Sequence, residues 1–522
     1  MKKIHILLII IMTFMIVIVG CSDDSTNSDG NITEEKESVV LNLEGGDWGY
    51  PSPYTHYSRG PGAYKMRLIF DSLLERGEEG LIPWLAEDWN ITNDGKTYTF
   101  NIRENVKWQD GQDMTAEDVK FSFEYYAKHP PVFDELNISK NNFIEKINVI
   151  DRHTISIDVD NPSATLLERF GSARILPKHI WNNVDDPKKF NSPKAVIGCG
   201  PYILTDYKKE QGAYRFKAFK DYWGPKQRAD VIQFVPVSDN ILAFEKGDID
   251  ITRVTPDILN KYKEDNKYKI IKNPGFWGYR LMFNMDNNPQ FKDKVLRQAI
   301  AYAIDKGEMI EKVARGAGKP ASAGYIPIDH RWYNKKVRKY DFNLDKSKKL
   351  LDGKKYSFTL LTGNRNQEVR IGELMKLSLE KVGIDLKVKS VDMKSRDAAV
   401  KNGDYEMVLI GHGGWGNDAD MLREKYVSEE NSIKTTFTGG IPGYGNDMIN
   451  NLAKKQLSEL DLDKRKEIVY NLQEVIAEEI PQIPLYNTTG YDVYRPSKYD
   501  GWRHVFDHHT VTHNKISYLE ME

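Results

Sequence analysis

The pattern that most constrains the fold is the interleaving of strand-like and helix-like segments along the chain after residue 38. In the first part, Thr115 followed by acidic residues opens a predicted helix, because a hydroxyl side chain caps free backbone N–H groups. Alternating apolar residues and turn signals predict strands around this helix. They lie at 39–43, on both sides of a turn at 93–96, and at 153–159. Strands mixed with helices in this way indicate an α/β protein.

The second part of the chain repeats this mixture. Apolar residues at helical spacing predict helices, and short alternating runs predict strands. The helices are predicted at 294–309, 369–382 and 462–480, and the strands at 356–361, 384–391 and 405–410. No internal repeat is visible, and 522 residues suffice for two or three hydrophobic cores.

The N-terminus carries a targeting pattern. Two lysines precede an apolar run at 6–19, which is short for a membrane span and typical of a secretory signal. The run ends at Gly20 and Cys21, a junction that resembles a bacterial lipobox, in which the cysteine is lipidated. We therefore expect a lipoprotein signal peptide at 1–20 and a lipid on Cys21 that anchors the protein outside the cytoplasm at the cell membrane. An uncleaved anchor helix is the alternative.

Composition limits the partners. Residues 21–38 are rich in Ser, Asp, Asn and Glu and predict a disordered tether. The net charge of −2 does not suggest a polyanionic partner, so we expect no nucleic acid. With Cys21 lipidated, Cys199 has no partner, which excludes a disulfide framework. We expect Cys199 to be a small buried side chain, with a soft metal ligand as the alternative.

Eight motifs, in order along the chain, carry a resemblance to a known family. They are 82–89 (IPWLAEDW), 94–100 (DGKTYTF), 106–111 (VKWQDG), 115–119 (TAEDV), 198–202 (GCGPY), 222–224 (YWG), 244–250 (FEKGDID) and 295–305 (VLRQAIAYAID). Together they make the chain similar to family 5 of the bacterial extracellular solute-binding proteins, the peptide and nickel receptors of ABC importers. The resemblance covers about residues 73–502.

The resemblance implies a two-lobed α/β fold of the periplasmic-binding-protein type (type II, cluster C), with an extra α/β domain on the first lobe. The first lobe would comprise 39–70, 172–273 and 485–522, the extra domain 71–171, and the second lobe 274–484. The hinge would lie near Pro274 and Pro484, and ligand would select the closed state. The implied partners are ABC permease subunits with their ATPases, and we expect a monomer.

The segment 47–62 is dense in aromatic residues and glycines, and in the family it lies beside the cleft. Trp48, Tyr50 and Tyr57 are candidates for flat apolar walls. Arg59 is a candidate for binding a carboxylate, because a guanidinium is a planar fork of donors. A loop stiffened by Gly and Pro, whose aromatic residues simply pack, is an equal alternative.

A glycine-rich loop at 413–420 follows the predicted strand 405–410. In peptide-binding relatives a Trp followed five residues later by Asp occurs here, and that Asp receives the ammonium group of the ligand. Trp415 and Asp420 match this offset. The Pro that follows in the family is replaced by Met421, so Asp418 is the alternative, and an acidic turn former is the alternative role.

Further candidates lie at the start of the predicted second lobe. Trp277 and Tyr279 stand where family members line the pocket with aromatic residues, and core packing is the equal alternative. Arg280 and Arg370 are additional basic candidates that no motif supports.

Four of the 11 histidines lie within 504–513. Neutral imidazole is the commonest metal ligand in proteins, and nickel accepts it. In a strand, His509 and His513 would share one face while His508 pointed away. Solvated imidazoles at the end of a surface strand are the alternative. The metal-ligand candidates, including loop residues that the resemblance to nickel receptors adds, are His56, His412, His508, His509 and His513.

The sequence favours a receptor over an enzyme. It contains no Gly-x-Ser-x-Gly elbow, no phosphate-binding loop, no His-Glu-x-x-His pair and no carboxylate pair that stands out for acid–base chemistry. We therefore predict a protein without catalysis or a resident cofactor. The resemblance implies that it captures a small peptide in the cleft and delivers it to a permease. A receptor for nickel or a nickel chelate, with Ni²⁺ as cargo, is the close alternative. A secreted hydrolase is the remote one.

Overall fold

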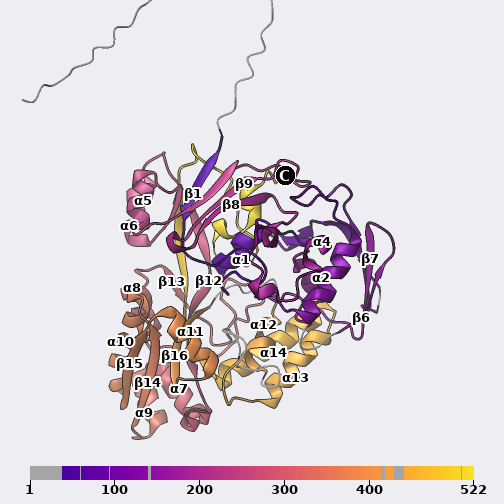
Figure 1. Cartoon of the computed structure of the whole chain (residues 1–522). Helices are drawn as coiled ribbons and strands as arrows, with labels where there is room; N and C mark the ends of the chain where they lie inside the picture. The colour runs from indigo at the N-terminus through magenta and orange to yellow at the C-terminus, as the bar shows by residue number, and fades with distance from the viewer. Residues whose placement is uncertain are drawn as a thin grey trace, which may run out of the picture. The chain divides into compact units, whose positions relative to one another are not determined.

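The computed structural model describes residues 38–58, 60–92, 94–138, 143–412, 418–427, 440–506, 508 and 510–521, without the side chains of His412 and Glu424. Cys21, the predicted signal peptide and all but the last residue of the predicted tether therefore lie outside the described residues. Residues 39–522 form one compact unit by their contacts. Figure 1 shows the order of its helices and strands.

The first sheet has four strands in the order β1-β10-β9-β8. Their bounds are Val40–Glu44, Val231–Val235, Ala213–Ala218 and Tyr202–Lys208. The strand predicted at 39–43 is confirmed as β1, in which Leu41 and Leu43 are buried and Glu44 is exposed. β1 and β10 are parallel, so their carboxyl ends, Glu44 and Val235, lie at the same edge of the sheet.

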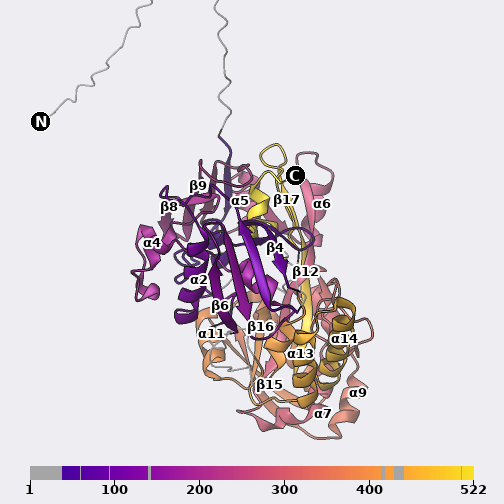
Figure 2. The same ribbon diagram turned by 90° about the vertical axis from the view of Figure 1, so that its right-hand side faces the viewer.

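A second sheet, visible in Figure 2, is antiparallel throughout, in the order β4-β5-β7-β6. Its strands are Ala86–Ile91, Thr97–Ile102, Thr154–Val159 and Ile144–Val149, and a short hairpin, β2 (Leu74–Arg76) and β3 (Leu81–Pro83), precedes it. Helix α2 (Ala116–Lys128) contacts β6 and β7. Its predicted start is confirmed, since the backbone N–H of Thr115 donates to the Asp118 carboxylate at 2.9 Å.

The largest sheet runs in the order β11-β17-β12-β16-β14-β15, with β13 paired to β17. In that order the strands are Ile251–Val254, Gln482–Tyr494, Lys269–Phe283, Met407–His412, Tyr356–Gly363 and Ile384–Val391, and β13 is Gly318–Pro320. β14 is parallel to both β15 and β16, while the other pairs are antiparallel. The strands predicted at 356–361, 384–391 and 405–410 are thereby confirmed.

Helices cover both faces of this sheet. Successive strand residues point to opposite faces, so Leu360 packs in one hydrophobic cluster and Leu361 in another. Helix α10 (Asn366–Glu380) contributes to the first cluster together with α7 (Lys294–Ala303) and α14 (Leu462–Glu479). Helix α11 (Met393–Asn402) contributes to the second cluster. Burial on both faces is typical of parallel strands in α/β proteins.

Strands β12 and β17 pass through the boundaries that we predicted between the lobes. The ladder between them shifts register between Asn273 and Trp277, next to Pro274. Beyond this shift, β12 pairs with β16 as well as with β17. Pro484 lies near the start of β17, opposite Arg280.

The remaining helices are short. They are α1 (Gly60–Arg67), α3 (Leu166–Ser172), α4 (Lys178–Trp181), α5 (Asn240–Lys246), α6 (Pro256–Lys263), α8 (Lys306–Lys312), α9 (Leu344–Leu351), α12 (Met421–Tyr426) and α13 (Asp447–Ser458). The helical prediction for 294–309 needs correction, because α7 ends at Ala303 and α8 begins at Lys306 with Asp305 as its N-cap. Within the described part of the chain, no helix is both long and apolar enough to cross a membrane.

Candidate functional site

The carboxyl ends of parallel strands meet at one edge of the largest sheet. β14 ends at Gly363, β15 at Val391 and β16 at His412. In open α/β sheets, ligands bind outside this edge, because the loops there bring polar groups from several strands together. We therefore take this edge, within the predicted second lobe, as one half of the candidate site.

A buried ion network fixes this edge. Arg396, on the first turn of α11, contacts Glu368 of α10 and, at 3.3 Å, Asp397. Glu368 also accepts a hydrogen bond from the backbone N–H of Gly363 at 2.9 Å. The arginine therefore holds the loop after β14 and the start of α11 in one arrangement. The loop after β14 also carries Arg365, which is exposed to solvent.

The other half of the site lies at the carboxyl ends of β1 and β10. The chain continues from β1 into a loop that its own backbone holds. The N–H of Gly45 donates to Val235 at 2.7 Å and that of Tyr57 to Trp48 at 2.7 Å. The Trp48 and Tyr57 rings lie 6.3 Å apart between centroids, and both side chains are half-buried. Both predicted residues therefore stand at this edge.

One hydrogen bond joins the two edges. The hydroxyl of Tyr57 donates to Oδ2 of Asp397 at 3.3 Å, across 340 positions in the sequence. Because Asp397 belongs to the ion network at the ends of β14 and β15, Tyr57 brings the loop after β1 against the second half of the site.

Charges of both signs face each other at this junction. Burial raises the pKa of Glu44, the last residue of β1, although its side chain remains exposed. The positive charges that oppose this rise are those of Lys65, Arg253 and Arg365. Burial lowers the pKa of Lys65 to about 7, and its Nζ lies 3.9 Å from the centroid of the Phe234 ring. The site therefore presents an accessible carboxylate from one sheet and an accessible guanidinium from the other.

Trp277 and Tyr279 differ in exposure. The Tyr279 ring is buried in the core below the sheet, and its hydroxyl donates to Gln367 at 3.4 Å. Trp277 is half-buried, with its ring 4.8 Å from that of Tyr279. A Cβ on Gly411 would lie 2.4 Å from this indole, so the ring packs closely against the end of β16. Trp277 is thus at the candidate edge, whereas Tyr279 lies beneath it.

The two candidate acids are both ion-paired. Asp420 is buried and binds Arg423 through both oxygens at 2.7 Å, accepts from Gln456 at 2.7 Å, and lies 3.6 Å from Arg169. Burial alone would raise the pKa of Asp420, but the arginines lower it. Asp418 binds Arg465 through both oxygens at 2.5 Å and keeps 17% of its side chain exposed. Trp415 and Arg59 lie outside the described residues.

The histidine candidates do not form one metal site among the described residues. Residues Val511–His513 form a short 3₁₀ helix, so the strand that we considered for this segment is wrong. His508 and His513 instead face each other with centroids 5.4 Å apart, and both contact Tyr64. His508 is buried and His513 is half-buried, and burial lowers the pKa values of both, to about 3 for His508. His509 and the side chain of His412 lie outside the described residues. Among the described residues no group of three His, Cys, Asp or Glu side chains is placed to hold a metal.

Three other residues that the sequence singled out differ in burial. Tyr50 is half-buried against Tyr207, with ring centroids 5.7 Å apart. Arg280 is buried and donates to Tyr325 and to Gln482, the latter at 3.1 Å. Cys199 is fully buried, as expected of a small side chain, and burial raises the pKa of its thiol.

Sequence reasoning missed the residues that come directly after the strands. Glu44, Arg365, Arg396 and Asp397 lie at or just beyond the ends of β1, β14 and β15. Their positions directly after predicted strands were the signal in the sequence that could have identified them.

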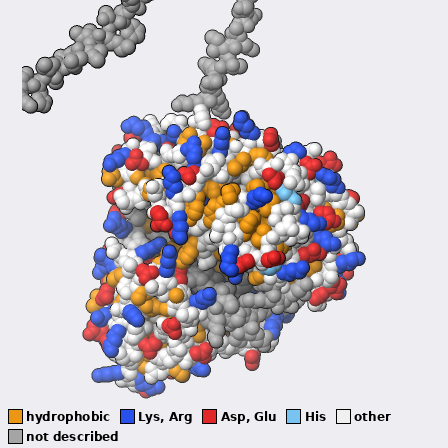
Figure 3. All heavy atoms as spheres, viewed as in Figure 1, with side chains coloured by type: hydrophobic (Ala, Val, Ile, Leu, Met, Phe, Trp, Pro, Cys, Tyr) orange, Lys and Arg blue, Asp and Glu red, His pale blue; other side chains and the backbone are white. Residues whose placement is uncertain are grey.

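On the face shown in Figure 3, hydrophobic side chains gather over α1 and β8, while cations and anions are interspersed elsewhere.

Comparison with known proteins supports one assignment. A profile of the bacterial extracellular solute-binding proteins, family 5 Middle, matches residues 80–434. The chain is 27% identical over 462 residues to the dipeptide-binding protein of Escherichia coli (strain K12), covering 80% of this chain and 83% of that protein. It is also 27% identical over 504 residues to di/tripeptide-binding protein 1 of Pseudomonas aeruginosa (strain UCBPP-PA14), covering 89% and 91%.

Solved structures agree on the fold. The oligopeptide-binding protein AppA from Bacillus subtilis, in complex with a nonapeptide, has a TM-score of 0.76 at 22% identity, covering 93% of this chain and 100% of that one. NikZ from Campylobacter jejuni, in complex with Ni(L-His), has a TM-score of 0.75 at 22% identity, covering 92% and 99%. The predicted α/β, two-lobed fold is confirmed. Because the family profile matches more than half of its length, the chain belongs to family 5 of the bacterial extracellular solute-binding proteins.

Proposed function

We propose that this protein captures a short peptide between the two sheet edges and delivers it to the permease of an ABC importer. The observation that carries the proposal is the Tyr57–Asp397 hydrogen bond, which brings aromatic side chains and opposite charges from the two edges together. A zwitterionic peptide needs such a pair of charges and flat walls between them. The names of the relatives, dipeptide-binding and di/tripeptide-binding proteins, support this class of cargo.

For the amino end of the peptide, we propose Asp418. A carboxylate has about four lone-pair positions, and three of those on Asp418 are used, two by Arg465 and one by the backbone N–H of Asp420 at 2.7 Å. The fourth position is on Oδ2 of a side chain that is 17% exposed, and we propose that it accepts from the ammonium group. Asp420 also accepts three short hydrogen bonds, but it is buried and lies near a second arginine, so we assign it a structural role.

For the carboxylate of the peptide, we propose Arg365, together with the sequence candidate Arg59. Arg365 is exposed and follows β14, and its nearest polar contact among the described residues is the sulfur of Met393 at 3.8 Å. A guanidinium with unused donors binds a carboxylate through two parallel hydrogen bonds. Trp48, Tyr57 and Trp277 would supply the apolar walls.

We propose that ligand selects a closed arrangement in which the extra domain also contacts the second lobe. Two contacts support this closure. The N–H of Ala164 donates to the carbonyl of Leu457 at 3.0 Å, and Arg169 lies 3.6 Å from Asp420. The register shift beside Pro274 is the proposed hinge, because a break in the ladder frees the strand to bend there.

The protein would act outside the cytoplasm, as members of this family do, held by a lipid on Cys21. Its partners would be the permease subunits and their ATPases, and it would work as a monomer without catalysis or a resident cofactor. A nickel chelate is the alternative cargo, for which His412 at the end of β16 is the best-placed candidate. A hydrolase is the remote alternative.

Calorimetric titration tests this proposal. The full-length protein is titrated with dipeptides and tripeptides and, separately, with Ni²⁺ plus free histidine. Arg365→Gln removes a charge-assisted hydrogen-bonding group worth about 1.5–3 kcal/mol, so peptide affinity should fall about 10- to 150-fold. Arg370→Gln is the matched control, because Arg370 is an exposed arginine on α10, the helix that Arg365 precedes as its N-cap. Binding of the nickel chelate but of no peptide would refute the proposed cargo.

A further inference from the structure

The predicted extra domain, residues 71–171, shares its core with the predicted first lobe. Leu41 of β1 and Ile232 of β10 belong to the same hydrophobic cluster as Phe100 of β5 and Phe123 of α2. The predicted second lobe has another core, to which no described residue of 71–171 contributes. Hinge motions turn bodies that each keep their own packing. The extra domain and the first lobe therefore form one body, and the second lobe forms the other.

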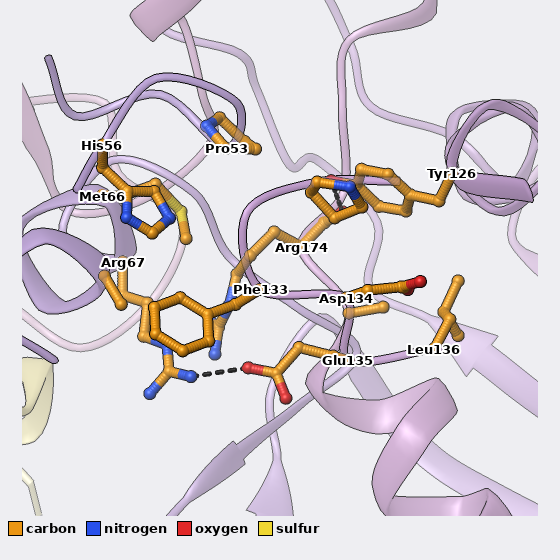
Figure 4. Close-up of a pocket in the computed structure, with 13 residues that line it drawn as sticks. Pro53, His56, Met66, Arg67, Tyr126, Phe133, Asp134, Glu135, Leu136 and Arg174 are labelled. Carbon is orange, nitrogen blue, oxygen red and sulfur yellow. Dashed lines mark hydrogen bonds and ion pairs between the residues drawn. The ribbon is translucent and has the colours of Figure 1, made fainter. Parts of the chain in front are cut away.

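Ion pairs stabilise the junction inside the first body. Arg67 of α1 donates to Glu135 of the extra domain at 2.6 Å, as the dashed line in Figure 4 shows. Arg174, in the predicted first lobe, donates to Glu75 of β2 at 2.9 Å, and both residues are buried. Breaking a buried ion pair leaves an uncompensated charge, so this junction stays intact when the cleft opens.

Contacts of three kinds run from this body to the second lobe. The first is a hydrogen bond, which the N–H of Ala164, just before α3, donates to the carbonyl oxygen of Leu457 on α13 at 3.0 Å. The second is the ion pair of Arg169 on α3 with Asp420, at 3.6 Å. The third is an apolar contact, made by the side chain of Leu460 between α13 and α14.

The turn between β4 and β5 receives this apolar contact. Asp94 holds the turn by accepting a hydrogen bond from the Thr92 hydroxyl at 2.6 Å. Gly95 has a φ of +69°, which favours glycine, and a Cβ there would lie 2.9 Å from Pro162 and 3.1 Å from Leu460. The absence of a side chain at this position therefore lets the turn lie close to the second lobe.

These contacts are suited to form and break reversibly. Asp420 binds Arg423 through both oxygens at 2.7 Å, so its buried carboxylate keeps a counter-ion when Arg169 moves away. Leu460 is already 50% exposed, so opening adds little apolar surface to solvent. The second lobe can therefore separate from the extra domain without leaving a buried charge unpaired on Asp420.

The ion pair also lies close to the proposed site for the amino end of the peptide. Gln456 donates to Asp420 at 2.7 Å and accepts from Arg465 at 2.7 Å. Arg465 in turn binds both oxygens of Asp418. One hydrogen-bonded network thus joins the residue that meets the extra domain to the residue proposed to meet the peptide.

We propose that the extra domain is a latch that sets how long the closed protein holds its peptide. Release requires the second lobe to leave the extra domain, so the contacts of Ala164, Arg169 and Leu460 slow dissociation. Association begins from the open arrangement, in which these contacts are absent, so its rate does not depend on them. This inference rests on the proposed function, because only a protein that binds a peptide in the cleft has a dwell time for it.

Stopped-flow tryptophan fluorescence on the full-length protein tests the latch. Traces at several concentrations of a dipeptide that calorimetry shows to bind give both rate constants. Leu460→Ala and Arg169→Met should each raise the dissociation rate constant about three- to tenfold and leave the association rate constant within about twofold. The controls are Leu462→Ala, at a 60% exposed leucine, and Arg152→Met, whose partner Asp113 lies in the extra domain. They should change neither constant. Dissociation as slow as in wild type for both latch variants would overturn the proposal.

Hydrogen exchange at the Ala164 amide gives a readout that needs no peptide. Its N–H is bonded to Leu457 only while the extra domain contacts the second lobe. In ligand-free protein, Leu460→Ala should speed this exchange about threefold or more relative to Leu462→Ala. Equal exchange in the two variants would overturn the latch. If no peptide binds in calorimetry, the proposed cargo is refuted, and the exchange rates still decide whether the contact works as a latch.

Discussion

The contact between Tyr57 and Asp397 gives the sharpest test of how the two sheet edges work together. Tyr57→Phe removes only the hydroxyl that donates to Asp397 at 3.3 Å and leaves the ring in place. A hydrogen bond to a charged acceptor contributes about 1.5–3 kcal/mol, and the long distance places this one at the lower end. If peptide binding requires this contact, loss of about 1.5 kcal/mol of hydrogen-bond free energy lowers the peptide affinity of Tyr57→Phe about tenfold.

The assay is calorimetric titration of a double-mutant cycle with Tyr57→Phe, Asp397→Asn and the double variant. Asp397 also contacts Arg396, so Asp397→Asn alone changes more than one interaction. The cycle isolates the interaction free energy between Tyr57 and Asp397. Tyr50→Phe is the control, because the Tyr50 hydroxyl donates to the carbonyl oxygen of Ser192 at 3.4 Å, and both residues belong to the predicted first lobe. Additive effects of the two substitutions, or an unchanged affinity for Tyr57→Phe, would refute the reasoning.

Three further predictions concern stability and the binding wall. His56 and His508 have folded pKa values below the unfolded value of about 6.5, so their contribution to stability is present above pH 6.5 and is lost as the pH falls. Urea unfolding should show a loss of about 2 kcal/mol per histidine between pH 7 and pH 5. A stability that does not change over this range would contradict buried neutral rings. Lys515 is buried and pairs with Asp71 and, at 2.7 Å, with Glu75. Lys515→Met should therefore lower the free energy of unfolding in urea by about 3–5 kcal/mol, while the exposed control Lys208→Met should leave it almost unchanged. Equal losses in the two variants would refute the buried network. Gly411→Ala places a Cβ 2.4 Å from Trp277, so it should displace the indole. The tryptophan fluorescence should then change and peptide binding should weaken. An unchanged fluorescence would be inconsistent with this packing.

Local patterns predicted the elements well, because strand and helix periodicity is written in neighbouring residues. The alternation at 384–391 coincides with β15, and the N-cap signal at Thr115 gives the start of α2. The helical spacing at 294–309 was less informative, since Asp305 caps a new helix inside it.

The site was harder to predict, because it depends on contacts between distant segments. Tyr57 and Asp397 are in contact although 340 positions separate them in the sequence, and neither local sequence predicts this contact. The ion pair of Asp418 with Arg465 likewise joins a loop to a helix 47 residues later. Packing around Tyr64 also decided the shape of the last segment, where His508 and His513 meet through a 3₁₀ turn.

The most direct measurement is a crystal structure of the protein grown with a dipeptide that calorimetry shows to bind. We predict the peptide between the two sheet edges, with its carboxylate on the Arg365 guanidinium, its amino group on Asp418, and Trp277 and Tyr57 against its side chains. A peptide bound anywhere else, or bound there with neither charged end on these two residues, would contradict the account.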